Sequence, residues 1–520
     1  MTLPSIAIHP WHNAAASVYY NDEVVLVVEF ERLINLKNAS FEFFEPIHCK
    51  EFILKEVYNY IKNEFGFTHY DKLLLGYGYG STVPQHYRDV FPANEYIVEE
   101  AHHGAHASNS FYQSPYNEAI IISFDGGSND GFFNIYKGTK GVELELLKSY
   151  GIDLGCHYHV LGSFCSEIKN YHALTAAGKV LGLQSYGKVI KEWIDPLKQF
   201  FSHTPPYTSF LHERLATLSS QIGITVSSHE QMSGENSYNF TRTAQEAFEE
   251  LFFEHTDEII KNNPTLPIIL TGGCALNITL NTNVKQRYNR EVFVAPNSSD
   301  CGLTVGTLCK YFKPLTPIDI TYKGIGILDK PCLMEYVNNR RGIKEPISRI
   351  ADDLAQNFIL GVVQGRSEHG PRALGNRSII CSPLSPNMKD TLNAKVKHRE
   401  WYRPFAPIVR LEDVSEYFEW EGESRWMNFC VRVKPKYTSQ LLAVTHVDET
   451  ARIQTITREQ NEFMYDLLTL FKEKTGVGVL VNTSFNVDGK PILSTIRDAF
   501  KVFDETQLDR LYIEGFYFVK

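Results

Sequence analysis

Short apolar runs that stop abruptly at glycine or at a charged residue limit most strongly what this chain can fold into. Such runs occupy residues 119–124, 266–270 and 359–363, and each is bounded by turn-forming residues. Runs of about four to eight apolar residues predict buried strands. Stretches with helical spacing of apolar residues, such as 50–65 and 238–261, alternate with them. This alternation predicts an α/β layer architecture.

The beginning of the chain predicts two strands, at residues 5–9 and 24–30. His12 falls in the connection between them. Polar side chains, among them Glu29, Arg32 and Lys37, follow the end of the second strand.

The length of the chain indicates more than one domain. A chain of 520 residues is too long for one ordinary core. Prolines cluster between Pro314 and Pro331, where helix signals are few. We therefore expect a boundary there, with domains of residues 1–328 and 329–520. Hydrophobic residues make up 43% and charged residues 22%, the usual balance of a soluble globular protein.

Composition also excludes several classes of protein. The sequence has no run of about eighteen apolar residues and no secretory pattern, so we expect neither a membrane span nor export. The nine cysteines, scattered from Cys49 to Cys430 without a CxxC pair, favour free thiols in a reducing cytoplasm. A formal charge of −10 argues against bulk attraction to nucleic acid. It leaves a local basic groove open.

An arginine-rich loop, residues 364–378, follows the apolar run 359–363. It contains Arg366, Arg372 and Arg377 together with three glycines. A guanidinium group carries a permanent charge and fits a carboxylate or phosphate with two bonds at a time. Glycine lets the backbone approach a ligand. The loop predicts a site for a polyanion, although a surface turn held by salt bridges would carry the same spacing.

Two histidines are spaced so that they could hold one metal ion, although a lone pair of this kind is a weak signal, and two aspartates stand separately at predicted strand ends. His102 and His106 stand four residues apart, so on a helix they share one face, whereas His103 points elsewhere. Asp125 and Asp300 each follow an apolar run, where a carboxylate can face a metal or a phosphate. The alternatives are solvated histidines and a hairpin turn after residue 124.

A third strand end carries a pair of glycines. Gly272 and Gly273 follow the run 266–270 and open a helix. Such a turn exposes backbone N–H groups to an anion, although a single glycine pair is weak support for a site.

Motifs along nearly the whole chain resemble those of the O-carbamoyltransferases of nodulation-factor and antibiotic-tailoring type. In chain order they are HHGAHA, FDGG, GKVLGLQSYG, TGGCALN, PNSSDCG, QGRSEHGPRALGNRSI, VKHREWYRPFAP, HVDETARIQT and VNTSFNVDGKPI. The resemblance implies an actin/Hsp70-like ATPase fold for residues 1–328. It implies a YrdC-like α/β domain for residues 329–520.

The same resemblance implies a two-step reaction. Carbamoyl phosphate and ATP would form carbamoyl-adenylate in the C-terminal domain, with release of pyrophosphate and phosphate. The carbamoyl group would then pass to an acceptor hydroxyl in the N-terminal domain. The residues that match family positions for this chemistry are His12, Lys397 and Arg403 as catalytic groups, and Arg372, Arg452, Asn482, Ser484, Gly272, Gly273, Asn277 and Lys179 as contacts to the co-substrates.

His102, His106, Asp125 and Asp300 match the metal ligands of the family. Mixed nitrogen and oxygen ligands suit iron, manganese or zinc better than calcium. The family assignment implies Fe(II), and Mg(II) would accompany ATP. A bound metal would act as a Lewis acid on the carbamoyl-adenylate.

The acceptor stays open between two classes. Residues 175–177 and 184–185 depart from the family pattern near the expected acceptor side. The chain is also short, like phage members that resemble 5-hydroxymethylcytosine carbamoyltransferases, which would place it in a host cytoplasm. DNA or a nucleotide therefore competes with a sugar, an aminoglycoside or another natural product. The aromatic residues Trp11, Tyr77, Tyr112 and Trp401 are candidates for base stacking, and Arg340, Arg341 and Lys344 are weak candidates for a basic groove.

Two other classes of function remain alternatives. One is a non-catalytic ATP-binding scaffold on the same fold. The other is a threonylcarbamoyl enzyme of transfer RNA maturation, which would need threonine and bicarbonate. A homodimer is also compatible with the resemblance.

Overall fold

The computed structural model describes residues 3–41, 50–76, 80–169, 171–202 and 211–520, which form two compact units. Unit 1 comprises Met1–Leu73, Pro84–Glu95 and Asp319–Lys520, and unit 2 comprises Leu74–Val83 and Tyr96–Ile318. The N-terminal strands therefore belong to the same unit as the C-terminal third of the chain. The expected division at residue 328 into a transferring and an adenylate-forming domain stays a prediction.

The first sheet is built from the N-terminal part of the chain. Its strand order is β3-β2-β1-β4-β5. The strands are β1 (Ser5–His9), β2 (Ala15–Tyr20), β3 (Glu23–Glu29), β4 (Tyr70–Gly76) and β5 (Ala93–Glu99). The helices of this region are α1 (Phe30–Ile34), α2 (Lys50–Phe65) and α3 (Gln85–Val90).

The sheet of unit 2 repeats the strand order of the first sheet. Its order is β10-β9-β6-β7-β8, with β6, β7 and β8 antiparallel and β9 and β10 added in parallel on the other side of β6. The strands are β6 (Glu118–Ser128), β7 (Gly131–Thr139), β8 (Glu145–Tyr150), β9 (Ile268–Thr271) and β10 (Val292–Val294). Two five-stranded sheets of the same order fit the actin/Hsp70-like fold that we expected.

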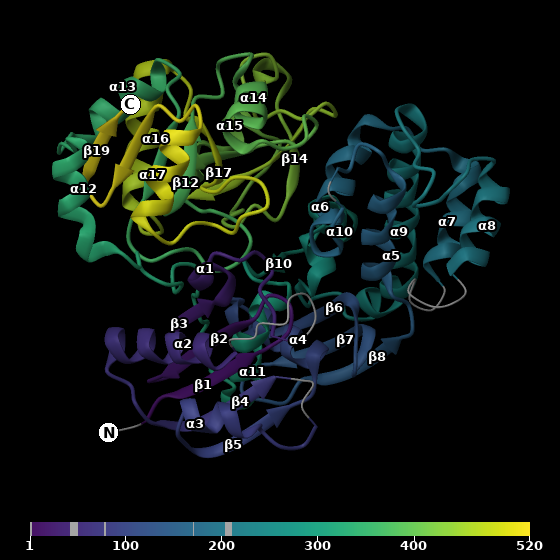
Figure 1. The fold of residues 1–520 in the computed structure, drawn as a ribbon. Helices are drawn as coiled ribbons and strands as arrows, with labels where there is room; N and C mark the ends of the chain where they lie inside the picture. The colour runs from purple at the N-terminus through teal and green to yellow at the C-terminus, as the bar shows by residue number, and fades with distance from the viewer. Residues whose placement is uncertain (1–2, 42–49, 77–79, 170, 203–210) are drawn as a thin grey trace. The chain divides into compact units, whose positions relative to one another are not determined.

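Helices of unit 2 accompany this sheet (Figure 1). They are α4 (His102–Gln113), α5 (Leu154–Val160), α6 (Ala173–Leu183), α7 (Ile194–Phe201), α8 (Leu211–Ile222), α9 (Glu235–Asn262), α10 (Ile278–Tyr288) and α11 (Leu303–Phe312). The rings of Phe124, Phe133 and Phe252 pack where α9 covers β6 and β7, with centroids 5.1–5.8 Å apart. Burying one such side chain stabilises the fold by roughly 1.5–3 kcal/mol.

A seven-stranded mixed sheet forms the C-terminal part of unit 1, drawn in green to yellow in Figure 1. Its order is β16-β13-β17-β12-β11-β18-β19. The strands are β11 (Leu360–Val363), β12 (Arg377–Cys381), β13 (Ala406–Arg410), β16 (Gln454–Ile456), β17 (Val479–Ser484), β18 (Arg510–Ile513) and β19 (Phe516–Val519), and a separate pair is β14 (Cys430–Arg432) with β15 (Thr450–Arg452).

The helices of this part are α12 (Leu333–Arg340), α13 (Ile347–Ala355), α14 (Met388–Thr391), α15 (Val414–Tyr417), α16 (Glu462–Thr475) and α17 (Ile496–Glu505). A π-helical turn, η7 (Leu392–Lys397), continues α14. Apolar residues of α13 and α16, such as Leu354 and Leu467, form one core with Ile380 and Leu480 of the sheet. The α/β fold class is thus confirmed throughout the described residues.

The expectation of two strands in the first thirty residues was wrong, because β2 is a third. Ala15, Ala16 and Ser17 open β2 and carry little β-propensity, so only its last three residues give a strand signal, which is too short to predict a strand. It forms because it is paired on both sides, with β1 and with β3.

Candidate functional site

The four predicted metal ligands converge in unit 2. One ligand atom from each of His102, His106, Asp125 and Asp300 lies within 4.8 Å of every other. His106 Nε2 is 2.9 Å from Asp125 Oδ2 and 3.3 Å from Asp300 Oδ1. The two Nε2 atoms of the histidines lie 3.1 Å apart. This group brings together one helix, the end of β6 and the 3₁₀ turn η5 (Asp300–Gly302).

Local sequence explains how α4 presents both histidines. A four-residue spacing places them one turn apart on one face. Asp130, in the turn between β6 and β7, accepts hydrogen bonds from the N–H groups of His103 and Gly104 and so satisfies the start of α4. His103 itself contacts Ser123 Oγ at 2.8 Å and lies outside the ligand group, as predicted.

The electrostatics of the group fit a cation. Burial lowers the pKa of His106, but hydrogen bonds to Asp125 and Asp300 outweigh burial and raise that pKa to about 9. Burial raises the pKa of Asp125, whereas His102 and His106 hold it well below its usual range. Two carboxylates and two imidazole nitrogens, mostly shielded from water, form a donor set suited to iron, manganese or zinc.

The glycine turn before α10 is shaped by close backbone packing. Gly272 has φ +90°, and a Cβ atom there would lie 2.2 Å from the carbonyl oxygen of Phe124. A Cβ atom on Gly273 would lie 2.8 Å from Asp125 Oδ1. Both glycines therefore let the β9 turn approach the end of β6. Asn277, a predicted co-substrate contact, caps α10 by accepting the N–H of Leu280.

Lys179, the remaining co-substrate candidate of unit 2, is buried in α6. Its Nζ donates to the carbonyl oxygen of Lys169 at 2.8 Å. This hydrogen bond within the protein holds the ammonium group of Lys179 in place. Its predicted contact with a co-substrate stays a prediction.

A second group, in unit 1, gathers positive charge; we call it the cation cluster. Burial lowers the pKa of each of its members for which a shift is resolved, and neighbouring cations lower it further: for Arg372 the pKa falls to about 10 beside Arg403. The Nε atoms of Arg372 and Arg452 are buried without a hydrogen-bond partner. The cluster consists of Arg372, Lys397, Arg399, Arg403 and Arg452.

Cations that repel one another in a buried place are unfavourable unless an anion compensates them. Among the described residues, Glu400 lies 3.6 Å from Arg403, and the charge of Asp488 also raises the pKa of Lys397 and of Arg399, but the neighbouring cations and burial outweigh both. The arrangement is therefore suited to a multiply charged anion, as the arginine loop predicted.

The arginine loop is held by its own polar groups. Arg377, fully buried, donates to the carbonyl oxygens of Gln364, Gly365 and Asn376. Arg366 donates to the carbonyl oxygens of residues 323 and 324. Arg366 and Arg377 thus hold the backbone of the loop. Arg372 is the arginine of the loop that belongs to the cation cluster.

Glu368, inside the same loop, gathers backbone donors. Its Oε1 accepts hydrogen bonds from the N–H groups of Leu374, Asn376 and Arg377. A carboxylate bound in this way fixes the curvature of the loop on either side of Arg372.

Contacts of Lys397, Asn482 and Ser484 connect the end of β17 with the cation cluster and the arginine loop. Lys397 Nζ donates to the carbonyl oxygens of Ser484 and Asn486 at 2.6 and 2.7 Å. Asn482 donates to the carbonyl oxygen of Ala373 at 3.1 Å, while its buried Oδ1 has no hydrogen-bond partner. Lys397 and Ser484 are therefore in contact, and Asn482 meets the arginine loop next to Arg372.

Arg399 is a member of the cluster that was not predicted from the sequence. Its Nε donates to Asn393 Oδ1 at 2.8 Å, and its guanidinium group lies 4.3 Å from the Phe405 ring centroid. Its signal was its place inside the VKHREWYRPFAP motif, two residues from Lys397 and four from Arg403. Its burial among other cations is a tertiary effect that the sequence does not reveal.

The remaining candidates differ in burial. His12 is half-buried in the connection after β1, with Nδ1 3.4 Å from Asn13 Oδ1. Of the residues named for DNA binding, Arg340 is paired with Asp504 by two hydrogen bonds. Tyr112 is buried in the core, whereas Trp401 is exposed; Tyr77 lies outside the described residues.

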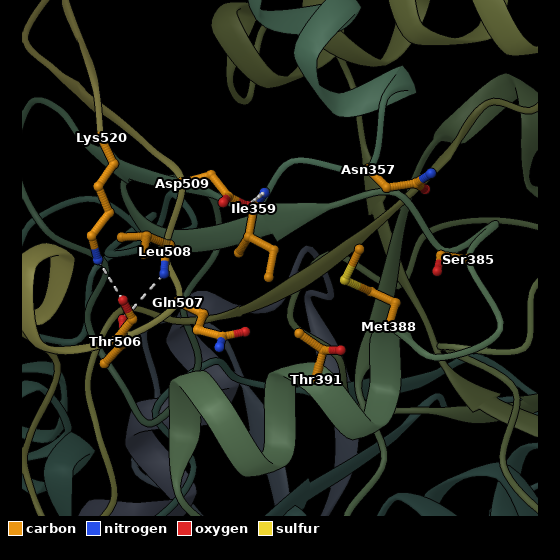
Figure 2. A pocket seen from close by; sticks show the side chains of 10 residues that line it. All are labelled: Asn357, Ile359, Ser385, Met388, Thr391, Thr506, Gln507, Leu508, Asp509 and Lys520. Carbon is orange, nitrogen blue, oxygen red and sulfur yellow. Dashed lines mark hydrogen bonds between the residues drawn. The ribbon is translucent and has the colours of Figure 1, made fainter.

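A hollow of about 420 Å³ lies in unit 1 between α14 and the segment before β18. Figure 2 shows the side chains that line it. Its two charged side chains bond to the protein itself: Asp509 accepts the N–H of Ile359, and Lys520 donates to the carbonyl oxygen of Thr506. None of the predicted site residues lines it.

Two further expectations concern the whole chain. Eight of the nine cysteines lie in the described part and are free thiols, and Cys49 falls outside it. Within the described residues, no helix combines the length and the apolar character needed to cross a bilayer.

Two family models match the chain: the carbamoyltransferase N-terminus over residues 43–309 and the carbamoyltransferase C-terminus over residues 351–520. Nodulation protein NolNO of Sinorhizobium fredii is 30% identical, over 98% of this chain and 79% of its own length. A 3'-hydroxymethylcephem-O-carbamoyltransferase of Streptomyces clavuligerus is 34% identical over 48% of this chain and 47% of its own length.

Among solved structures, full-length HypF in its phosphate- and nucleotide-bound form matches 61% of this chain and 57% of its own length. Its TM-score is 0.36 at 11% identity.

Proposed function

Because this chain belongs to the carbamoyltransferase family, and is therefore a carbamoyl-transferring enzyme, we propose that it is an ATP-dependent O-carbamoyltransferase that works through carbamoyl-adenylate. Carbamoyl phosphate and ATP would react at the cation cluster of unit 1. The carbamoyl group would then be passed to an acceptor hydroxyl beside the four-ligand group of unit 2.

The observation that carries this proposal is the cation cluster, whose five cations outnumber the carboxylates near them. ATP and carbamoyl phosphate together bring several negative charges, which repel unless fixed cations lie between them. Arg372 and Arg452 have buried, unpartnered Nε atoms, so they have hydrogen bonds to give. Their guanidinium groups can each hold a phosphate with two bonds.

The proposed activation has two steps. Water cleaves carbamoyl phosphate to carbamate and phosphate. A carbamate oxygen attacks the α-phosphorus of ATP, and pyrophosphate leaves with the electrons of the broken P–O bond. The cluster would hold the three phosphates and stabilise the charge that moves onto pyrophosphate. Lys397, which fixes the end of β17, would keep Ser484 and the cluster in register.

In the proposed transfer, the acceptor oxygen attacks the carbamoyl carbon and AMP leaves with the electrons of the C–O bond. The hydroxyl proton goes to a base, for which His12 is the candidate. His102, His106, Asp125 and Asp300 would hold a divalent metal, iron(II) by family resemblance, and such an ion would supply Lewis-acid polarisation. Asp130 and the glycine turn keep these four residues in place.

For the acceptor we favour the hydroxyl of a small molecule. The named relatives include an enzyme that carbamoylates a hydroxymethylcephem and nodulation proteins. DNA containing 5-hydroxymethylcytosine is the second candidate. The pairing of Arg340 with Asp504 and the net charge of −10 speak for the small molecule.

The first test is pyrophosphate release from ATP and carbamoyl phosphate, with mass spectrometry of candidate acceptors. The panel holds sugars, aminoglycosides, a hydroxymethylcephem and DNA with 5-hydroxymethylcytosine. We expect release with carbamoyl phosphate, a carbamoyl mass gain on a small-molecule acceptor, and no response to threonine and bicarbonate. A chain that bound ATP and released no pyrophosphate would be the non-catalytic scaffold.

Two variants separate the proposed steps. Arg372→Ala should lower pyrophosphate release by at least about a hundredfold, because an anion contact in the transition state is lost, whereas the exposed Arg458→Ala should not. His106→Ala should keep pyrophosphate release and lose transfer. Loss of both activities in His106→Ala would contradict the separation of the two steps.

A further inference from the structure

We infer that Arg32 is a positioning residue of the activation site, a role that rests on the proposed function and deepens it. Arg32 lies in α1, ahead of residue 43, where the N-terminal family model begins to match. It is 3% exposed and belongs to unit 1, as does the arginine loop.

The Arg32 side chain binds backbone carbonyl groups of the arginine loop. NH1 donates to the carbonyl oxygen of Glu368, and NH2 donates to that of Gly370 at 2.5 Å. These two carbonyl groups lie on either side of His369 in the sequence, and Arg372 follows two residues after Gly370. The planar fork of a guanidinium group fits two acceptors at a fixed spacing, which a lysine ammonium cannot do.

An acidic partner orients this fork. Glu29 Oε2 lies 2.9 Å from Arg32 Nε and 3.4 Å from His369 Nδ1. Burial raises the pKa of Glu29, but Arg32 and His369 outweigh burial and lower it, so the carboxylate stays charged. The buried charge of Arg32 is thus compensated by a carboxylate at 2.9 Å.

Other braces of the arginine loop come from the loop itself, from residues 321–325, and from more distant side chains such as Asn482 of β17, which donates to the carbonyl oxygen of Ala373. Arg377 and Glu368 bind loop backbone, and Arg366 binds residues 323 and 324. Arg32 instead holds the turn at Gly370, which has φ +104°, from a segment more than 330 residues away in sequence. Arg32 therefore fixes the direction in which the chain reaches Arg372.

Small displacements of a binding group are costly in catalysis, since a shift of about 1 Å can lower a rate about a hundredfold. Releasing the turn at Gly370 should move Arg372 relative to the rest of the cluster. The predicted consequence is a defect in activation, with the acceptor side unaffected.

The test uses the full chain with Arg32→Lys, which keeps the charge and removes the fork. The matched control is Arg510→Lys, because Arg510 is also a buried arginine of unit 1 and pairs with Asp353 at 2.6 Å. We expect Arg32→Lys to lower kcat for pyrophosphate release at least about tenfold and to raise KM for carbamoyl phosphate. Arg510→Lys should lower Tm comparably and change neither constant, and KM for the acceptor should be unaffected in both.

Hydrogen–deuterium exchange of residues 364–376 gives a readout that needs no activity. Exchange there should quicken in Arg32→Lys and not in Arg510→Lys. Equal kinetic constants and equal exchange in the two variants would show that Arg32 only stabilises the fold and would overturn the inference. A wild-type chain that releases no pyrophosphate would instead remove the proposed function, while the exchange result would still decide whether Arg32 holds the loop.

Discussion

Asp153 is a fully buried carboxyl group close to the candidate metal ligands. Its Oδ1 caps α5 by accepting the N–H of Cys156 at 2.8 Å, and its Oδ2 is buried without a hydrogen-bond partner. Burial raises the pKa of Asp153 to about 6, the charge of Asp125 adds to this, and the bond from Cys156 opposes it. Folding therefore disfavours the charged form of the Asp153 side chain.

Asp153→Asn should therefore change how stability depends on pH. The folded state holds the proton more tightly than the unfolded state, whose pKa is near 4, so the wild type loses up to about 3 kcal/mol of stability as pH rises from 4 through 6. Asparagine keeps the helix cap and has no charge to bury. The Tm of Asp153→Asn relative to wild type should rise over this interval and level off above pH 7.

The control for this experiment is Asp390→Asn, which removes an exposed aspartate in unit 1. Its Tm difference from wild type should stay flat over the same interval. A flat difference for Asp153→Asn as well would mean that the carboxyl group finds a partner in solution, such as a buried water.

At the scale of elements, α4 and α11 are packed closely enough to set the metal ligands. A Cβ atom on Gly306 of α11 would lie 1.9 Å from the carbonyl oxygen of Ala105 in α4. Asn109 of α4 also exchanges hydrogen bonds with Asn297, in the segment that leads to Asp300. The helix with two ligands and the turn with one are thus held as one piece.

Gly306→Ala should force these helices apart and loosen the ligand group. Overpacking costs about 1–3 kcal/mol, and we expect iron(II) or zinc(II) affinity to fall at least about tenfold, measured by titration of the purified chain. Gly178→Ala is the control, because a Cβ atom at Gly178 in α6 meets nothing within 4 Å. That variant should gain up to about 1 kcal/mol from helix propensity and bind metal normally. Unchanged affinity in Gly306→Ala would show that the helix contact does not set the ligands.

The elements that sequence predicted well share a local cause. The strands that lead to Asp125, to Gly272 and to the arginine loop contain apolar runs followed by turn residues, and a short window contains both signals, although β6 continues past Asp125 to Ser128. Strand β2 was not predicted because only its last three residues carry a strand signal. Pairing with β1 and β3 completes the strand. At the site, ligand identity followed from motifs. The contact of Arg32 with Gly370 joins segments that no local pattern relates.

For the molecule as a whole, net charge and local charge have opposite signs. The chain carries a formal charge of −10, yet unit 1 concentrates buried arginines that lower one another's pKa. The folded state therefore stores repulsion that a polyanion can relieve.

Inorganic pyrophosphate should accordingly raise the Tm of the full chain. At a hundred times its Kd the gain is about 2.7 kcal/mol, and added salt should weaken it by screening. Arg372→Gln should lose most of the gain, whereas Arg458→Gln, an exposed arginine paired with Glu462, should keep it. A gain that is insensitive to Arg372 would place the pyrophosphate elsewhere.

The route of the chain between its two units imposes an order of synthesis. All residues of unit 2 precede residue 319, whereas the last strands of unit 1 come at the very end. A growing chain on the ribosome therefore possesses every residue of the metal-ligand group before it possesses Arg372 or Arg452. Arg32, made early, must wait for its partners at residues 368 and 370. The unit proposed to consume the activated carbamoyl group can thus be complete in sequence before the unit proposed to produce it.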